Sequence, residues 1–414
     1  MLTVAEAIAA IVRETSRLSA VRVKLADALG RVLAEDAVSD LDSPPFDKAL
    51  MDGYAIRAAD AARPDARLRV IDEVLAGQVS RQSVGPGEAI RIMTGALVPI
   101  GADAVVPVER TRLEEAERDQ TVVVVNPAGL SVGKNILKRG ASTRQGTRVV
   151  PAGRTLRMQE IGALAELGRA EVAVFPAPRV AVLATGDELV PVEQTPGPGQ
   201  IRNSNESMLV AQLRSMGAVA HPLGVARDDP AELRNRIGKG LAHDVLLLSG
   251  GVSAGKLDLV PAALAEAGVR QVFHKVLVKP GQPIWFGVKE PSGATRPVGA
   301  VRPCCVFGLP GNPVSSMVCC ELFVRTAIRA LAGIEPAEPR PMRGTLTRDH
   351  RNVGNRPTYH PAKWEWTEQG GRVEPVKWVG SADLGATVEA NALAVFADAD
   401  RNYTSGSIVD VLLF

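Results

Sequence analysis

The chain has 414 residues, 46% of them hydrophobic, which is enough for about two to four domains with apolar cores. A formal net charge of +2 and an aromatic content of 4% argue against a basic stripe or a stacking surface for DNA or RNA. No apolar stretch approaches the ~20 residues of a membrane span, and the start of the chain predicts an amphipathic helix capped by Thr3 and Glu6 rather than a signal peptide. We expect a cytoplasmic protein with neither a nucleic acid nor a membrane as partner.

The first part of the chain combines helical and β patterns. Further helices are predicted at 24–34 and 157–167. Short alternating segments between residues 66 and 126 predict a small β-domain. Residues 336–414 show the same alternation after a proline-rich linker, with a hairpin signal at Gly370-Gly371. Two β-modules are therefore expected.

The middle of the chain alternates short apolar runs with helical patterns. Nearly continuous apolarity is typical of strands that are covered on both faces. This alternation predicts a doubly wound α/β domain. The predicted strands are 179–184, 218–224, 244–248 and 304–308, and the predicted helices are 205–216, 230–241, 259–267 and 315–331.

Five polar turns lie in the same region, most of them directly after one of the predicted strands. In an open parallel sheet the carboxyl ends of the strands lie at one edge, where ligands bind. We therefore expect these turns to form one site for a phosphate-bearing ligand. They are residues 185–188, 226–229, 249–255, 279–281 and 309–313.

The loop 249–255 opens a predicted helix, so its backbone N–H groups are suited to hold an anion. Gly250, Gly251, Ser253 and Gly255 are the expected ligand contacts. The spacing nearly matches a P-loop, but Leu257 stands where a Ser or Thr hydroxyl would bind magnesium. A nucleoside triphosphatase remains an alternative at this point.

Acidic and basic side chains accompany these turns. The carboxylates of Asp187, Glu188, Asp228 and Asp258 together suit one or two Mg²⁺ ions, although each could singly be a helix cap, as Asp229 is expected to be. Lys275 and Lys279 flank a strand-like run, so both ammonium groups should lie on one face, about 13 Å apart at Cα. They would hold two ends of a polyanion, or converge if Pro280-Gly281 bends the chain.

Cysteines and histidines carry little signal. The vicinal pairs Cys304-Cys305 and Cys319-Cys320 fit buried reduced thiols, with a metal or redox role as the alternative. The five histidines lie in no triad pattern, and only His274, beside Lys275, is expected near the cleft.

Five motifs in a fixed order point to a family. They are Met51-Asp52-Gly53-Tyr54-Ala55, then Thr-Gly-Asp-Glu-Leu from 185, Ser-Gly-Gly-Val-Ser-x-Gly-x-x-Asp from 249, Lys-Pro-Gly-x-Pro from 279 and Leu-Pro-Gly-Asn-Pro-Val-Ser from 309. Over essentially its whole length the sequence resembles the molybdopterin molybdenumtransferase (MoeA) family, whose relatives include the E domain of gephyrin.

The resemblance implies a multi-domain α/β protein that forms an elongated homodimer, with a site shared between protomers. A central doubly wound α/β domain, similar to MogA, would carry a mainly β inserted domain and a small C-terminal β-barrel-like domain. The implied parts are a dimerisation subdomain at 1–45 and 145–175, a β-rich insertion at 46–144, a molybdopterin-binding domain at 176–333 and a β-domain at 334–414.

The resemblance also implies a reaction. Adenylylated molybdopterin and molybdate would yield molybdenum cofactor and AMP with Mg²⁺, and a transient contact with the adenylylating enzyme of the pathway is implied. The residues that the resemblance implies to be catalytic are Asp52, Glu188, Asp228, Asp258, Lys275 and Lys279. The implied metal ligands are Asp187, Glu188, Asp228 and Asp258. The implied substrate-binding residues are Thr94, Gly250, Gly251, Ser253, Gly255, Pro310, Asn312, Ser315, Arg356 and Ser381.

The charges agree with this reaction, because like charges ~4 Å apart repel by about 4 kcal/mol at an effective dielectric near 20. Fixed cations are needed to bring two oxyanions together.

The sequence also departs from the family pattern, at Ser142 in Gly140-Ala141-Ser142, Lys48-Ala49, Asp383 and Leu259. A divergent paralogue, a scaffold without chemistry and the related adenylylating enzyme remain alternatives.

Overall fold

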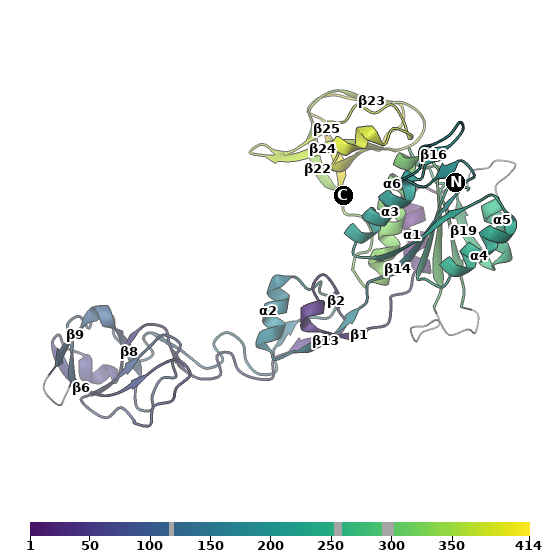
Figure 1. Ribbon diagram of the computed structural model, residues 1–414. Coiled ribbons are helices and arrows are strands. Elements are labelled where there is room, and N and C mark those ends of the chain that lie inside the picture. Colours follow the sequence, from purple (N-terminus) through teal and green to yellow (C-terminus); the bar gives the residue numbers. More distant parts are fainter. Residues whose placement is uncertain (116–119, 252–258, 292–301) are drawn as a thin grey trace. The chain divides into compact units, whose positions relative to one another are not determined.

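The computed structural model describes residues 1–115, 120–251, 259–291 and 302–414, and it forms two compact units (Figure 1). The larger unit contains residues 1–34, 153–157 and 171–414. The smaller unit contains residues 35–152 and 158–170.

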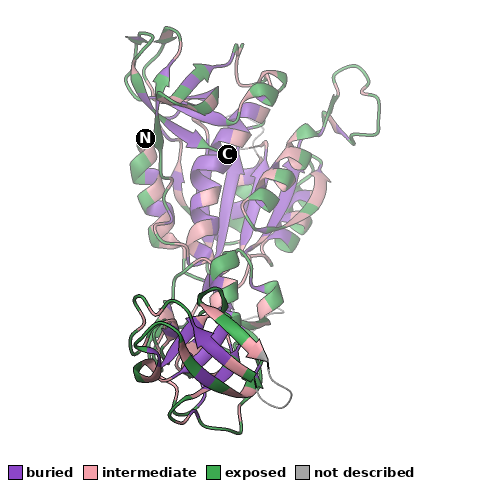
Figure 2. Ribbon diagram, turned by 90° about the vertical axis from the view of Figure 1, so that its left-hand side faces the viewer, coloured by how far each residue is buried: buried purple, intermediate pink, exposed green. Residues whose placement is uncertain are grey.

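A six-stranded sheet forms the centre of the larger unit, in the order β17 (Val219–Ala226), β14 (Arg179–Thr185), β18 (Val245–Ser249), β21 (Cys304–Leu309), β20 (Trp285–Lys289) and β19 (Val269–His274). The first four strands are parallel, and β20 runs antiparallel to both of its neighbours. All four predicted strands are present. Strands β14, β18 and β21 are buried along almost their whole length (Figure 2). Their continuous apolar sequences suit strands that are covered on both faces.

Helices cover both faces of this sheet, which confirms the doubly wound α/β prediction. One face packs on α1 (Val4–Glu14), α3 (Ser204–Ser215), α6 (Pro313–Cys319) and α7 (Arg325–Leu331). The other face packs on α4 (Pro230–Gly240) and α5 (Leu259–Glu266). A π-helical turn, η4 (Cys320–Val324), joins α6 to α7, so the predicted helix 315–331 is continuous but changes its winding.

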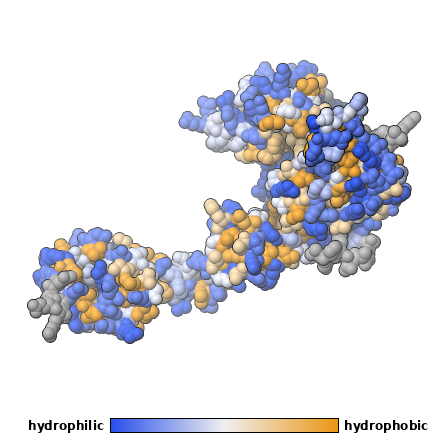
Figure 3. Space-filling model, in the orientation of Figure 1, coloured by the Kyte–Doolittle hydropathy of each residue, from blue (hydrophilic) through white to orange (hydrophobic). Residues whose placement is uncertain are grey.

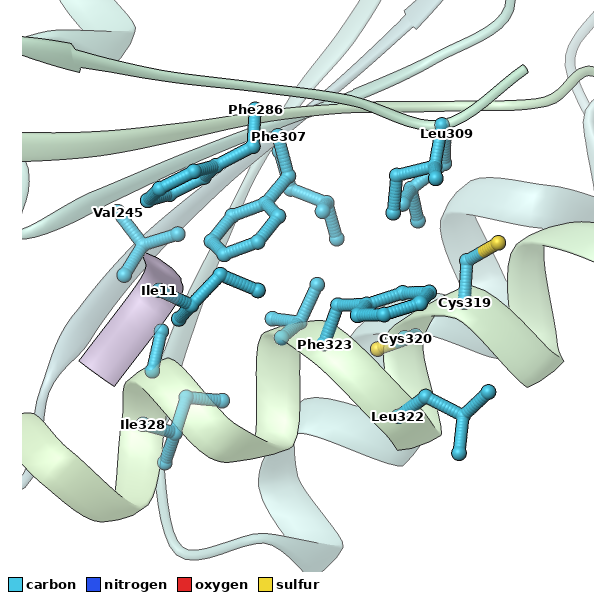
Figure 4. Packing of buried hydrophobic residues seen from close by; sticks show 14 of the residues in the cluster. Ile11, Val245, Phe286, Phe307, Leu309, Cys319, Cys320, Leu322, Phe323 and Ile328 are labelled. Atoms are coloured by element: carbon cyan, nitrogen blue, oxygen red, sulfur yellow. The ribbon is translucent and has the colours of Figure 1, made fainter. Parts of the chain in front are cut away.

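The core of the first face consists of aromatic and aliphatic side chains (Figure 4). Phe286 and Phe307 of the sheet lie 4.8 Å apart between ring centroids, beside Ile11 of α1 and Phe323 of η4. All four cysteines are buried and free, as predicted. Burial raises the pKa of the Cys319 and Cys320 thiols well above the usual value, which keeps them protonated and unreactive.

The C-terminal part of the larger unit is a closed five-stranded barrel. Its strands follow the order β22 (Met342–Leu346), β25 (Gly370–Pro375), β24 (Thr358–Thr367), β26 (Ala392–Phe396) and β28 (Ile408–Leu413). The hairpin signal at Gly370-Gly371 marks the antiparallel pairing of β24 with β25. The short strands β23 (His350–Asn352) and β27 (Arg401–Tyr403) pair beside the barrel.

The predicted helix at 24–34 is wrong. Thr3 does cap α1 with Glu6, but residues 21–33 form β1 (Val21–Lys24), a single 3-10 turn (Leu25–Asp27) and β2 (Val32–Leu33). Gly30 has φ +76°, outside the helical region, and its N–H donates to Leu156 O. Long-range bonds of this kind, and pairing of both strands with β13 (Glu171–Phe175), replace the local helical bonds.

The smaller unit is mainly β, as predicted. Its six-stranded sheet has the order β8 (Ala104–Pro107), β5 (Gly53–Ile56), β7 (Glu88–Ile92), β6 (Ala66–Val74), β10 (Gln120–Val124) and β9 (Thr111–Glu115), with an apolar cluster on either side. Helix α2 (Met158–Glu166) also belongs to this unit, as do the pairs β3–β12 (Ala37–Val38, Arg148–Val150) and β4–β11 (Lys48–Ala49, Ile136–Leu137).

The short pair β15–β16 (Leu189–Val190, Ile201–Arg202) lies beside the central sheet in the larger unit. Among the helices of the described residues, none combines the length and apolarity required to cross a bilayer.

Candidate functional site

The predicted polar turns converge at one edge of the central sheet. Thr185, Ala226, Ser249 and Leu309 are the last residues of their parallel strands. Thr185 pairs with Ala226 and Ser249 pairs with Leu309, while Ser249 also pairs with Ala184, one residue before Thr185. Residues 275–284, which connect β19 to β20, leave the sheet at this edge too, because His274 pairs with Trp285 and Trp285 with Gly308. The turns at 185–188, 226–229, 279–281 and 309–313 and the described start of the turn at 249–255 therefore lie at one edge, as expected, whereas residues 252–255 lie outside the described residues.

A first hollow of about 280 Å³, which we call the sheet-edge hollow, lies among these turns. Asn205, at the start of α3, donates through Nδ2 to Ser249 Oγ (2.9 Å) and to Gly311 O (2.8 Å), so it ties the ends of β18 and β21 together. The surrounding surface near β16 is mainly hydrophilic (Figure 3). The lining also includes Thr185, Glu188, Arg202, Asn203, Gly250 and Asn312.

Glycine is required at position 250 of this hollow. Gly250 has φ +94°, and a Cβ there would lie 2.7 Å from Thr185 O. At Gly251, φ is +65° and a Cβ would meet Val260 Cγ2 at 2.6 Å. Gly311 differs, because an added Cβ would meet only Gly250 Cα, at 3.9 Å. The glycines of the 249–251 turn therefore let the backbone pass close to its neighbours.

A second hollow of about 590 Å³ lies between the sheet-edge turns and the barrel, and we call it the barrel-side hollow. The α/β domain contributes the turns at 279–283 and 310–315, and the C-terminal domain contributes residues of β23 and β24 and the loop 378–381. Six of the residues predicted from the sequence line it: Lys279, Pro310, Asn312, Ser315, Arg356 and Ser381.

Two cations of this hollow lack a carboxylate partner within the described part of the chain. Lys279 Nζ donates to a backbone carbonyl, Val353 O, at 2.9 Å. Arg356 Nη1 donates to the amide oxygen of Gln282 and to Val278 O. Arg351, by contrast, contacts Asp400 at 3.3 Å. Unneutralised charge on Lys279 and Arg356 makes this hollow suited to an anion.

Asn312 lines both hollows and joins them. Its Nδ2 donates to Ser381 Oγ at 2.8 Å, and the N–H of Val314 donates to Ser381 O at 3.0 Å. Ser381 of the C-terminal domain is thus fixed on the turn that follows β21. A ligand that occupied both hollows would pass this pair.

The predicted metal carboxylates are only partly assembled. Asp187 Oδ1 accepts the N–H of Asp228 at 3.2 Å, and Glu188 lines the sheet-edge hollow. Outside residues 116–119, 252–258 and 292–301, no group of three or more His, Cys, Asp and Glu side chains is close enough to hold a metal ion. Asp258, the fourth predicted ligand, lies outside the described residues, as do Ser253, Gly255 and Leu257.

The predicted strand through Lys275 and Lys279 is wrong. Strand β19 ends at His274, and Lys275 has φ +68°, which breaks the alternation of side chains. Val276 instead bridges Leu2, and Lys279 bridges Thr358 of the barrel. The assumed Cα separation for a straight strand therefore does not apply. Lys279 faces the barrel-side hollow, while Lys275 lines neither hollow.

Sequence reasoning missed the histidines of the barrel-side hollow and named His274, which lines neither hollow. His350 stacks on Phe396 at 3.9 Å and lies 4.8 Å from His360. Burial lowers the pKa of His350 to about 4, aided by the positive charges of Arg348 and Lys279, and burial also lowers the pKa of His360. In the sequence, the closely spaced arginines at 348, 351 and 356 could have indicated an anion site in this region.

The smaller unit brings together two further predicted residues. Asp52 Oδ1 accepts both the backbone N–H and the hydroxyl of Thr94, each at 2.7 Å. These bonds lower the pKa of Asp52, so this exposed carboxylate is ionised.

One of the departures from the family pattern has a local structural role. The carboxylate of Asp383 accepts the N–H groups of Val379 and Ala386, both at 3.2 Å, and so holds the loop around Ser381.

Comparisons with known proteins agree with this architecture. Family models match residues 2–168 as the MoeA N-terminal region (domain I and II), 181–330 as a probable molybdopterin binding domain and 343–414 as the MoeA C-terminal region (domain IV). A molybdopterin molybdenumtransferase from Staphylococcus aureus (strain COL) is 34% identical over 417 residues, covering 100% of this chain and 95% of the relative. One from Staphylococcus epidermidis is 33% identical over the same shares.

Solved structures agree as well. The crystal structure of a molybdopterin biosynthesis MoeA protein from Pyrococcus horikoshii has a TM-score of 0.80 at 30% identity and covers 100% of this chain and 99% of that one. The chain belongs to the MoeA family of molybdopterin molybdenumtransferases, which are enzymes of molybdenum cofactor biosynthesis.

Proposed function

We propose that this enzyme converts adenylylated molybdopterin and molybdate into molybdenum cofactor and releases AMP. The barrel-side hollow contains the molybdate site, and the sheet-edge hollow holds part of the pterin nucleotide. The observation that carries the proposal is the pair of cations, Lys279 and Arg356, which face one hollow without a carboxylate partner in the described residues.

Charge neutralisation is the main contribution of the barrel-side hollow. Two oxyanions held ~4 Å apart repel by about 4 kcal/mol at an effective dielectric near 20, so each fixed cation lowers the energy of bringing them together. The hydroxyls of Ser315 and Ser381 and the amide of Asn312 are neutral donors at the same hollow. Catalysis then rests on positioning and charge, without a protein nucleophile.

The sheet-edge hollow suits a polar, partly anionic group. The backbone at Gly250 is open to a ligand, and the hollow offers amides, hydroxyls and Arg202. Magnesium fits the donor set of this edge, since carboxylate oxygens are its preferred ligands. Because Asp187, Glu188 and Asp228 do not by themselves form a group of three, an ion bound to them would need further oxygen ligands from Asp258 or from the substrate phosphates, whose charge it would screen.

A homodimer is part of the proposal. Asp52 of one protomer serves the cleft of the other, as the family resemblance implies, and Thr94 contributes to substrate binding. Their mutual hydrogen bonds, and the ionised and exposed state of Asp52, support such a role. A transient contact with the adenylylating enzyme of the pathway would deliver the pterin nucleotide directly.

The test supplies the purified protein with adenylylated molybdopterin, molybdate and Mg²⁺. AMP and molybdenum-loaded cofactor should form in equal amounts, and omission of molybdate should suppress the cofactor. If no cofactor forms, and the protein instead hydrolyses ATP supplied with Mg²⁺, the triphosphatase alternative is supported and the proposal is contradicted. Light scattering coupled to chromatography measures the expected dimer.

A further inference from the structure

The ammonium group of Lys279 is held by a backbone carbonyl that belongs to an exposed loop. Lys279 Nζ donates to Val353 O at 2.9 Å, and Val353 as a residue is 56% exposed. A lysine side chain has four rotatable bonds and carries a point charge, so its direction depends on the partner that it finds. The position of Val353 O therefore decides where this charge lies in the barrel-side hollow.

The residue before Val353 is anchored in the C-terminal domain. Asn352 is 1% exposed, and its Nδ2 donates to Asp398 O at 2.7 Å and to Phe396 O at 3.3 Å. Its Oδ1 accepts the hydroxyl of Thr358 at 2.6 Å, and Thr358 is itself 3% exposed. These three bonds use both donors and one lone pair of the amide, so the end of β23 is fixed on the barrel.

Thr358 is also attached to the other end of Lys279. The backbone of Lys279 forms a parallel bridge with Thr358, in which the Lys279 N–H donates to Pro357 O and Lys279 O accepts the N–H of Tyr359. The connections form a closed ring, from the Lys279 backbone through Thr358 and the Asn352 amide to Val353 O and back to the ammonium group.

We propose that Asn352 and Thr358 are positioning residues for the oxyanion site, because their side-chain hydrogen bond sets the direction of the Lys279 ammonium group. This inference rests on the proposed role of Lys279 in binding molybdate. Neither residue needs to touch the substrate. Loss of the Thr358 hydroxyl leaves a buried amide oxygen with one partner fewer and frees Val353 O to move.

The experiment measures the dissociation constant of molybdate by calorimetry and, separately, the KM for molybdate and kcat. Thr358→Val keeps the shape of the side chain and removes the hydroxyl. It should raise both molybdate constants by about tenfold, since small displacements of positioned groups have large effects. The affinity for adenylylated molybdopterin should change by less than about twofold, which is the variation expected when two sites are independent. Thr358→Ser restores the hydroxyl and should restore the constants.

Two controls separate positioning from general destabilisation. Thr387→Val removes a hydroxyl that donates to Leu384 O at 2.7 Å in the same domain, away from the hollow, and should leave molybdate binding unchanged. Thermal unfolding of every variant measures the change in stability. In a Lys279→Ala background, Thr358→Val should have no further effect on molybdate binding, because its effect is transmitted through the lysine.

Each outcome decides a separate point. An unchanged dissociation constant in Thr358→Val, or an equal increase in the Lys279→Ala background, overturns the positioning role. A wild-type protein that binds molybdate but makes no cofactor contradicts the proposed function, while the positioning role is still judged by the dissociation constants. Unchanged binding in Lys279→Ala overturns both.

Discussion

The two hollows of the larger unit share Asn312 but differ in chemistry and in origin. The sheet-edge hollow is formed by the α/β domain, with Ala382 as its contact from the C-terminal domain, and it carries amides, hydroxyls, Glu188 and Arg202. The barrel-side hollow draws about equally on two domains and carries the cations Lys279, Arg351 and Arg356. This difference supports the proposed division of labour, in which the sheet-edge hollow, of about 280 Å³, binds part of the pterin nucleotide and the cations of the larger barrel-side hollow, of about 590 Å³, bind molybdate.

The greatest loss of activity should follow removal of charge from the barrel-side hollow. Lys279→Ala removes a cation that lacks a carboxylate partner in the described residues, and kcat/KM for molybdate should fall by about a hundredfold, as for the loss of one preorganised charge donor. Steady-state kinetics with varied molybdate measures this. Lys363→Ala is the matched control, because Lys363 contacts Glu389 at 2.8 Å on the barrel surface and should leave the kinetics unchanged. Equal losses in both variants would show that the hollow has no special role.

The next effect belongs to the sheet-edge hollow. Gly250→Ala places a methyl group 2.7 Å from Thr185 O at φ +94°, and should weaken binding of the pterin nucleotide by about tenfold, with ~1–3 kcal/mol of lost stability from backbone strain. Calorimetric titration and urea unfolding measure the two. In Gly311→Ala the added methyl group has space, so binding should change little. If both alanine variants bind normally, the ligand does not approach this turn.

A smaller effect is expected where the two hollows meet. Ser381→Ala removes the hydroxyl that accepts from Asn312 Nδ2, a loss of about 1 kcal/mol or roughly a fivefold weaker affinity. Both ligands should be affected, because Asn312 lines both hollows. Titrations with molybdate and with the pterin nucleotide test this, and an effect on neither ligand would contradict the joining role.

The smallest expected effect concerns pH. Because the folded-state pKa of His350 is lowered from its usual 6.5 to about 4, the unfolded chain binds a proton that the native protein does not bind in this window. Stability should therefore fall as the pH decreases from 6.5 to about 4, and His350→Gln should make that decline shallower. Urea unfolding between about pH 7.5 and 4 measures how the free energy of unfolding of each protein depends on pH, and the value at the highest pH serves as the reference. A steeper decline in the variant would show that His350 does not destabilise the native protein at low pH.

The sequence allowed most of the sheet-edge hollow to be predicted. Continuous apolar runs identify buried strands, and a turn after each strand must then lie at the same edge. Gly250, Glu188 and Asn312 were found in this way, and the structure brings them to one hollow. The helices of the α/β domain were equally readable because their apolar stripes and caps are local signals.

The barrel-side hollow was harder to predict because its contacts are long-range. The partner of Lys279 is the backbone carbonyl of Val353, which no residue type reveals. His350 and His360 lie in alternating β-segments without a motif, and their proximity depends on β23 packing beside the barrel. The wrong helix at 24–34 has the same cause, since backbone bonds to residues 154–156 override a local helical pattern.

Anomalous diffraction at the molybdenum edge from crystals soaked in molybdate would locate the bound oxyanion. We expect a peak in the barrel-side hollow, within hydrogen-bond distance of Lys279, Arg356 and Ser381, and its loss in Lys279→Ala crystals. A molybdenum peak at another place on the protein, with the hollow empty, would contradict the proposed molybdate site.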